Sequence, residues 1–127
     1  MRGRMASDAL TDAQLRLWLR HLHTPGRLAD PSIRDLLRAH GRTHDGPPLA
    51  IAREASTLLL EKIGALQPVQ GAPREAWRSY MVLTVSFVQG QKVSAVAERL
   101  GMSERQVTRE RTRAIRLLRS ELETPGA

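Results

Sequence analysis

Cysteine is absent from this chain, and lysine and aromatic side chains are rare. Without cysteine, disulfide bonds, thiolate zinc sites and cysteine nucleophiles are all excluded. No apolar run is long enough to cross a bilayer, and the opening sequence MRGRMASD has no apolar signal-peptide core. We therefore expect an intracellular protein without a membrane segment, in which residues 1–7 form a disordered tail.

The few aromatic residues sit in apolar helical contexts. They are Trp18, Trp77, Tyr80 and Phe87. Proteins that bind single-stranded DNA or RNA usually present exposed rings on which the bases stack. We expect these four rings to lie in the core, which argues against a single-strand binder and favours recognition of a duplex.

Catalytic and metal-binding patterns are also missing. The sequence contains no GxSxG motif, no HExxH motif and no glycine-rich phosphate-binding loop. His40 and His44 are four residues apart, but Gly41 is expected to end their helix, and Asp45 is the only close carboxylate. We therefore expect no enzymatic activity, no metal and no cofactor, and we expect the histidines to be surface or loop residues.

Positive charge is abundant. The chain has 20 Lys and Arg against 13 Asp and Glu, a net charge of +7, which favours a polyanionic partner. Residues 1–71 and residues 72–127 are both basic, so both halves of the chain could approach DNA. Lys62 and Lys92 are the only lysines, and this preference for arginine could equally reflect the base composition of the genome.

No segment alternates between polar and apolar residues, so the sequence predicts an all-α fold with no sheet. Helices are expected over residues 11–23, 31–41, 48–66, 73–90 and 93–100, and from 103 or 104 to about 123. Thr11 and Gln14 form a capping box at the first start, and Pro25 and Gly26 end that helix. Asp30 can cap the helix that follows.

The helices fall into two parts. Residues 8–67 are predicted to form a helical N-terminal module, residues 68–73 a linker with prolines and a glycine, and residues 74–123 the second part. The helix after Pro73 is apolar almost all the way round, which indicates burial on several sides. We expect it to be a central scaffold that contacts both parts.

Two roles remain open for the N-terminal module. It could be a packing platform, or it could carry a surface for homodimerisation or for another partner. The predicted core stripes of the first three helices consist of Leu15, Trp18, Leu19, Leu22, Ile33, Leu36, Leu37, Ile51, Ala55, Leu58, Leu59 and Ile63. Leu17 and Leu28 fall outside these stripes, so they are candidates for an exposed apolar contact.

The most specific pattern is VSAVAERLGMSERQVTRERTRAIRLLR, residues 93–119. It predicts a short helix, a glycine turn and a longer helix rich in arginine. Ala97 is small where the two helices would cross, and Gly101 tolerates the positive φ that a sharp turn requires. Val107 follows six residues later, where the second helix would press back on the first. This spacing is typical of a helix-turn-helix.

Ser103 and Gln106 add a capping box at the start of the second helix. With these residues, the segment from Trp77 to Leu122 resembles domain 4 of bacterial sigma factors, which reads the −35 promoter element. The segment resembles the sigma-4-type helix-turn-helix of bacterial regulators still more closely. The matching residues are Leu100, Gly101, Met102, Ser103, Glu104, Arg105, Gln106, Arg109, Glu110, Arg111, Ala114, Ile115 and Leu118.

The resemblance covers about a third of the chain and has two departures. Lys92 occupies the usual N-cap position of the first motif helix, and Glu110 stands where many helix-turn-helix proteins have an apolar residue. The resemblance implies a cytoplasmic, nucleoid-associated bacterial regulator. It further implies contact with RNA polymerase near the −35 element.

The second motif helix should place one polar face in the major groove. The predicted DNA-contacting residues are Ser103, Arg105, Gln106, Thr108, Arg109, Thr112, Arg113 and Arg116. Arg105 and Arg109 are expected to read guanine O6 and N7. Arg113 and Arg116 are expected to meet phosphates, and Thr108 a thymine methyl group or a phosphate.

Arg111 instead projects onto the core stripe of the second helix, beside Val107 and Ala114. Its stem can cover apolar surface while its guanidinium pairs with an acid such as Glu98.

The sequence thus predicts a transcription regulator that binds double-stranded DNA sequence-specifically. One alternative is a protein-interaction module that docks on RNA polymerase or a regulatory partner and has little affinity for DNA. Another is an architectural role on DNA in phage packaging or recombination. A pure docking module should not need Arg105, Arg109, Arg113 and Arg116 together on its outward face.

Overall fold

The computed structural model describes residues 10–24 and 31–123, and over these residues the protein is all-α, as predicted. The elements are α2 (Asp12–Arg20), α3 (Pro31–Ala39), α4 (Pro48–Ala65), α5 (Arg74–Leu83), the π-helical segment η2 (Thr84–Val88), α6 (Val93–Leu100) and α7 (Glu104–Glu123). Within the described ranges, no helix is both long and apolar enough to cross a membrane.

Several expectations lie outside the described residues. They concern the tail over residues 1–7, the helix ends at Pro25 and Gly26, the cap at Asp30 and the exposed contact at Leu28. The first helix is shorter than expected, because α2 ends at Arg20 and a turn follows it. The expected helix over residues 73–90 changes at Thr84 from α-helical to π-helical hydrogen bonding.

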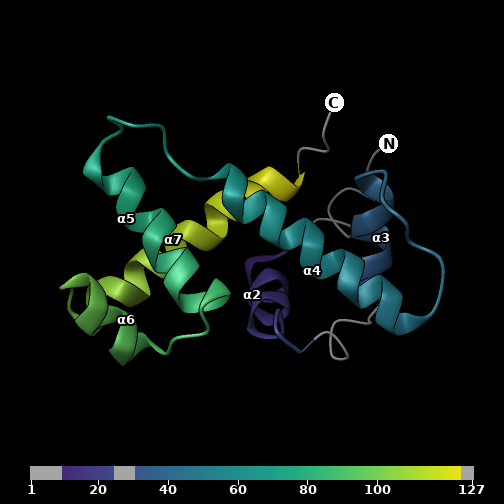
Figure 1. Ribbon diagram of the computed structural model, residues 1–127, viewed down its shortest axis with the longest axis horizontal. Coiled ribbons are helices and arrows are strands. Elements are labelled where there is room, and N and C mark those ends of the chain that lie inside the picture. The colour runs from purple at the N-terminus through teal and green to yellow at the C-terminus, as the bar shows by residue number, and fades with distance from the viewer. Residues whose placement is uncertain (1–9, 25–30, 124–127) are drawn as a thin grey trace.

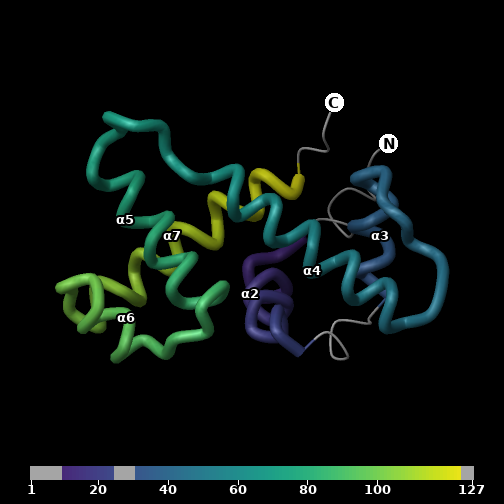
Figure 2. Tube along the Cα trace, viewed as in Figure 1, coloured from purple at the N-terminus to yellow at the C-terminus, as the bar shows by residue number. Residues whose placement is uncertain are grey.

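The helices form an elongated molecule (Figure 1). At one end, α3 packs against α4, and at the other end α5 and α6 pack against α7. Figure 2 shows α7 running from the α6 end towards the middle of the molecule. There α7 also packs against α2 and α4, so this one helix belongs to both halves of the chain.

The larger of two hydrophobic cores joins the N-terminal helices to the second half of α7. Its buried members are Leu15, Trp18, Leu19, Leu22, Ile33, Leu37, Ile51, Ala52, Ala55, Leu58, Leu59, Ile63, Leu83, Phe87, Ala114, Ile115, Leu118 and Leu122. The core stripes predicted for the first three helices all contribute to it, with Leu36 only partly buried. The linker at 68–73 therefore joins α4 to α5 without separating two independent cores.

The smaller core holds the α6 end together and consists of Val82, Val85, Val96, Ala97 and Val107. The segment formed by α5 and η2 contributes to both cores, because Leu83 and Phe87 belong to the larger one. This matches the central scaffold role expected for the segment.

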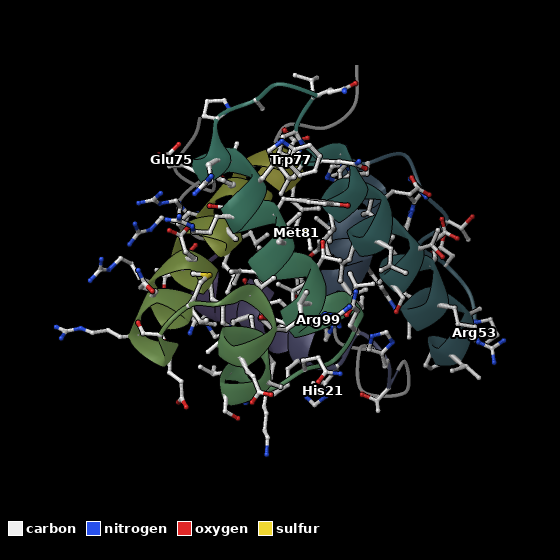
Figure 3. The ribbon with its side chains drawn as sticks, turned by 60° about the vertical axis from the view of Figure 1, so that its left-hand side comes forward. His21, Arg53, Glu75, Trp77, Met81 and Arg99 are labelled. Atoms are coloured by element: carbon white, nitrogen blue, oxygen red, sulfur yellow. The ribbon has the colours of Figure 1, made fainter. Side chains whose placement is uncertain are left out.

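The prediction that all four aromatic rings are buried is wrong for two of them. Trp18 and Phe87 are buried, but Trp77 and Tyr80 are partly exposed and form an edge-to-face pair with ring centroids 6.2 Å apart. Met81, on the same helix, is 36% exposed. In Figure 3, Trp77 and Met81 lie on the outer side of α5. The reason is that α7 is the main element packed against α5, so the far side of α5 remains uncovered.

Two histidines connect distant segments. His23 Nε2 lies 2.7 Å from the carbonyl oxygen of Val88 and 3.1 Å from that of Phe87, and His40 Nε2 lies 2.8 Å from that of Leu122. Each ring nitrogen can donate to carbonyls near the end of a helix, where backbone acceptors lack partners within the helix. Among the described residues, no group of His, Asp and Glu side chains is placed to hold a metal ion.

Candidate nucleic-acid interface

The turn between α6 and α7 has the geometry that its sequence requires. Gly101 adopts φ 65° and ψ 38°, a left-handed conformation that costs glycine little. The amide of Met102 donates to the carbonyl of Ala97 at 2.9 Å, which satisfies an acceptor left open at the end of α6. Val96, Ala97 and Val107 then pack together in the smaller core, so α6 holds the start of α7 in place.

The capping box at the start of α7 is present. Ser103 Oγ accepts a hydrogen bond of 3.1 Å from the backbone amide of Gln106, and Gln106 Oε1 accepts one of 2.9 Å from the backbone amide of Ser103. The helix begins at Glu104, within the predicted start. At the start of α6, Lys92 makes no such side-chain cap, in keeping with the departure noted in the sequence.

Replacing Ser103 with alanine should destabilise the protein by about 1 kcal/mol, because the backbone amide of Gln106 loses Ser103 Oγ as its hydrogen-bond acceptor. Denaturant unfolding followed by circular dichroism measures this loss. Ser103→Asp is the matched control, since aspartate keeps a capping oxygen and should retain most of the stability. Equal stability of the wild type and Ser103→Ala would contradict the capping role.

The predicted DNA-contacting residues gather on the outward surface of α7 and its N-terminal turn. All are exposed except Thr112, which is partly buried. The hydroxyl groups of Thr108 and Thr112 donate to the carbonyls of Glu104 and Thr108, at 3.0 and 3.1 Å. Their hydrogens are thus used within the helix, while their methyl groups remain for apolar contact.

The arginines of this surface differ in their partners. Arg113 lies 3.8 Å from the Glu110 carboxylate, and Arg116 lies 3.7 Å from that of Asp12 on α2. Arg105 and Arg109 have no ion pair or hydrogen bond from their side chains to any described residue. Two guanidinium groups at the start of α7 are therefore available to an external acceptor.

Glu110, the second departure from the family pattern, is buried. Its Oε1 accepts a hydrogen bond of 2.9 Å from Ser79 Oγ on α5, and its other oxygen faces Arg113. The helix therefore accommodates a carboxylate here because α5 provides a hydroxyl donor at the same place.

The expected pairing of Arg111 with Glu98 is wrong. The Arg111 guanidinium lies over the Phe87 ring, 4.9 Å from its centroid, which is the geometry of a cation–π contact. Burial lowers the pKa of Arg111, and the positive charges of Arg16 and Arg20 on α2 lower it further. Arg111 does lie at the edge of the core as predicted, but it faces α2 cations instead of an α6 acid.

Three residues of α2 near α7 were not singled out from the sequence. Asp12 pairs with Arg119 at 3.0 Å as well as with Arg116, and Arg16 and Arg20 lie near Arg111. The available signals were the basic character of residues 1–71 and the four-residue spacing of the two arginines, which puts them on one helix face. Neither signal indicates that α2 packs beside α7.

No family model, curated protein or solved structure matches this chain.

Proposed function

We propose that this protein is a transcription regulator that binds double-stranded DNA sequence-specifically and inserts the first half of α7 into the major groove. The observation that carries the proposal is the state of Arg105 and Arg109. Both are exposed at the start of α7, and neither has an acidic partner among the described residues. A guanidinium fork without a protein partner can donate to guanine O6 and N7 together.

The support around this helix favours the same function. A recognition helix must enter the groove at a fixed angle, and α7 is held by α6 at its start and by α5 and α2 further along. The N-terminus of α7 also offers backbone amides and a positive helix dipole, which favour a phosphate near Ser103. Gln106 Oε1 accepts from the Ser103 backbone amide in the capping box, which orients the side chain, and the side-chain Nε2 can donate to DNA.

The other predicted contacts take supporting roles. Thr108 and Thr112 can place methyl groups against thymine, since their hydroxyl hydrogens are already donated within α7. Arg113 and Arg116 can exchange their carboxylate partners for phosphates. For Arg116 the exchange costs little, because this arginine is mostly exposed and exposed ion pairs contribute about 0–1 kcal/mol. Arg113 is also exposed, but its partner Glu110 is buried, so the exchange leaves the Glu110 carboxylate with the hydrogen bond from Ser79.

A protein-docking function is the main alternative, and the same surface argues against it. The centre of a protein–protein interface is enriched in aromatic residues, methionine and arginine and depleted of the other charged residues. The outward surface of α7 carries arginines and threonines but no aromatic residue and no methionine. Contact with RNA polymerase and homodimerisation through the N-terminal helices are additional proposals that leave this surface free.

Selection from a random duplex library with the purified full chain, at stated salt, tests the proposal. We expect enrichment of one short motif in which guanines occupy the positions read by Arg105 and Arg109. Arg53→Ala is the matched control, because this exposed arginine lies on α4 at a distance from α7, and it should select the same motif. Recovery of duplexes without any shared motif would contradict sequence-specific reading.

A further inference from the structure

The outer face of α5 is only partly covered by the fold. It consists of Arg74, Trp77, Tyr80 and Met81, which all fall within about 60° of Trp77 around the helix at 100° per residue. The main element packed against α5 is α7, on the side of the helix that carries the buried residues. Met81 is 36% exposed, Trp77 and Tyr80 are partly exposed, and Figure 3 shows Trp77 and Met81 pointing to the same outer side.

The residue types on this face are those that protein–protein interfaces prefer. Tryptophan, tyrosine, methionine and arginine are all enriched at interface centres, and three of these four are the commonest residues with a large effect on binding. The rings of Trp77 and Tyr80 pair edge to face, with centroids 6.2 Å apart. Because the two rings already hold each other in place, binding a partner would cost them little conformational freedom.

The polar groups of this face are mainly donors. Arg74, and Arg78 at the edge of the face, make no ion pair or hydrogen bond through their side chains to any described residue, and the Trp77 indole N–H has no acceptor there. Guanidinium and indole groups can only donate. Glu75, the acid of α5, lies about 160° around the helix from Trp77. A complementary partner therefore carries carboxylates.

Three other occupants are less complementary to this face. A second copy packed face to face would oppose arginines to arginines, which is repulsive. The parts of the chain outside the described residues contain three arginines and two aspartates, so they have no excess of acid. The phosphates of DNA could accept from the arginines, but the DNA backbone offers no apolar surface to cover Trp77 and Met81.

We propose that the outer face of α5 is a docking surface for an acidic amphipathic helix of a partner protein. Trp77 and Met81 are four residues apart, so they form one apolar strip along α5 that the apolar side of a partner helix can cover. Carboxylates beside the partner's apolar side would accept hydrogen bonds from Arg74 and Arg78. The docking surface lies on a different helix from the predicted DNA-contacting residues and does not depend on DNA binding.

Selection with the full chain from a displayed library of helical peptides, about five turns long and random at their surface positions, tests the proposal. We expect enrichment of peptides that combine apolar residues three and four apart with several Glu or Asp beside them. On binding, the indole resonance of Trp77 should shift in NMR spectra, whereas that of the buried Trp18 should stay in place. Recovery of no peptide, or of peptides without an excess of acid, overturns the proposal.

Charge reversal tests the role of the arginines. Arg74→Glu with Arg78→Glu should weaken binding of the selected peptide roughly tenfold or more, because attraction becomes repulsion. The same variant should bind a peptide in which lysines replace the acids. Arg38→Glu with Arg53→Glu is the matched control, since it makes the same charge change on α3 and α4, and it should bind the selected peptide with nearly the affinity of the wild type.

Met81→Ala is a second test that does not change the charge. Removing this partly exposed side chain should weaken peptide binding roughly fivefold or more, because a partner would bury it. Circular dichroism should show that all variants are folded, and Arg74→Glu places an acid in the first turn of α5, where the helix dipole favours it. Unchanged peptide binding by Met81→Ala overturns the proposal.

The remaining measurements identify the other occupants. Peptide binding that is lost in Arg105→Ala with Arg109→Ala, while the Trp77 resonance never moves, would place the peptide on α7 and overturn the docking surface. Displacement of the peptide by the selected duplex would assign the face to DNA, and self-association of the chain that Met81→Ala abolishes would assign it to a second copy. If no duplex binds but the peptide results hold, the docking surface stands and the proposed function falls.

Discussion

Replacing Arg105 or Arg109 with alanine should weaken binding to the selected duplex by about 1–3 kcal/mol, roughly 5- to 150-fold, and relax base preference at one position. The reason is that each guanidinium group has no acidic partner among the described residues and can make two hydrogen bonds to a single guanine. Titration of labelled duplexes that differ at one base pair at a time, at fixed salt, measures both effects.

The specificity change distinguishes base reading from simple charge loss. Arg53→Ala removes the same charge from α4 and should bind all the duplexes like the wild type. Circular dichroism should show that both α7 variants are folded, because exposed arginines contribute little to stability. If Arg105→Ala and Arg109→Ala weaken binding equally on every duplex, these residues contact phosphates, and base reading must be assigned elsewhere.

Leu118→Ala should destabilise the protein by about 2–5 kcal/mol. Leu118 is fully buried in the larger core, in the half of α7 that packs against the N-terminal helices. Truncation would leave a cavity where these helices meet, and the surrounding backbone can only partly close it. Denaturant unfolding measures the loss. Leu117→Ala is the matched control. Leu117 is next to Leu118 in the chain but is 47% exposed, so this substitution should change the stability by less than about 0.5 kcal/mol.

The same experiment tests whether the two halves of the chain fold as one unit. Trp18 reports on the larger core, and Trp77 reports on the α5 end. In each variant that keeps one tryptophan and carries phenylalanine at the other, the unfolding curves followed by tryptophan fluorescence and by circular dichroism should coincide, as expected for a single cooperative transition. Leu118→Ala should shift both curves together. Separate transitions would show that residues 8–67 and 74–123 are independent domains, contrary to a core shared through α7.

The sequence was sufficient where local rules decide the structure. Apolar residues at helical spacing identified the buried stripes of α2, α3 and α4, because each of these helices buries one face. The capping residues Ser103 and Gln106 identified the start of α7, and Gly101 identified the turn before it. These features depend on residues within one or two helical turns, so the order of the residues largely determines them.

The sequence was insufficient where distant segments meet. Whether Arg111 faces Glu98 or the cations of α2 depends on how α2 packs against α7, and Asp12 and Arg116 are far apart in the chain. Apolar character alone also overstated the burial of Trp77, because helical periodicity does not show how many neighbours surround a helix. The candidate base readers were therefore accessible from the sequence, whereas the ion pairs of Asp12 with Arg116 and Arg119 were not.

The central claim is that the start of α7 reads a DNA duplex, and the affinity of the full chain for duplex DNA across a salt series tests it most directly. Fluorescence anisotropy of the selected duplex and of a scrambled one, between 50 and 200 mM salt, gives both affinity and salt slope. We expect tighter binding to the selected duplex at every salt, and affinities for both duplexes that fall steeply as salt rises. Absence of binding to either duplex, even in dilute buffer, would contradict the claim.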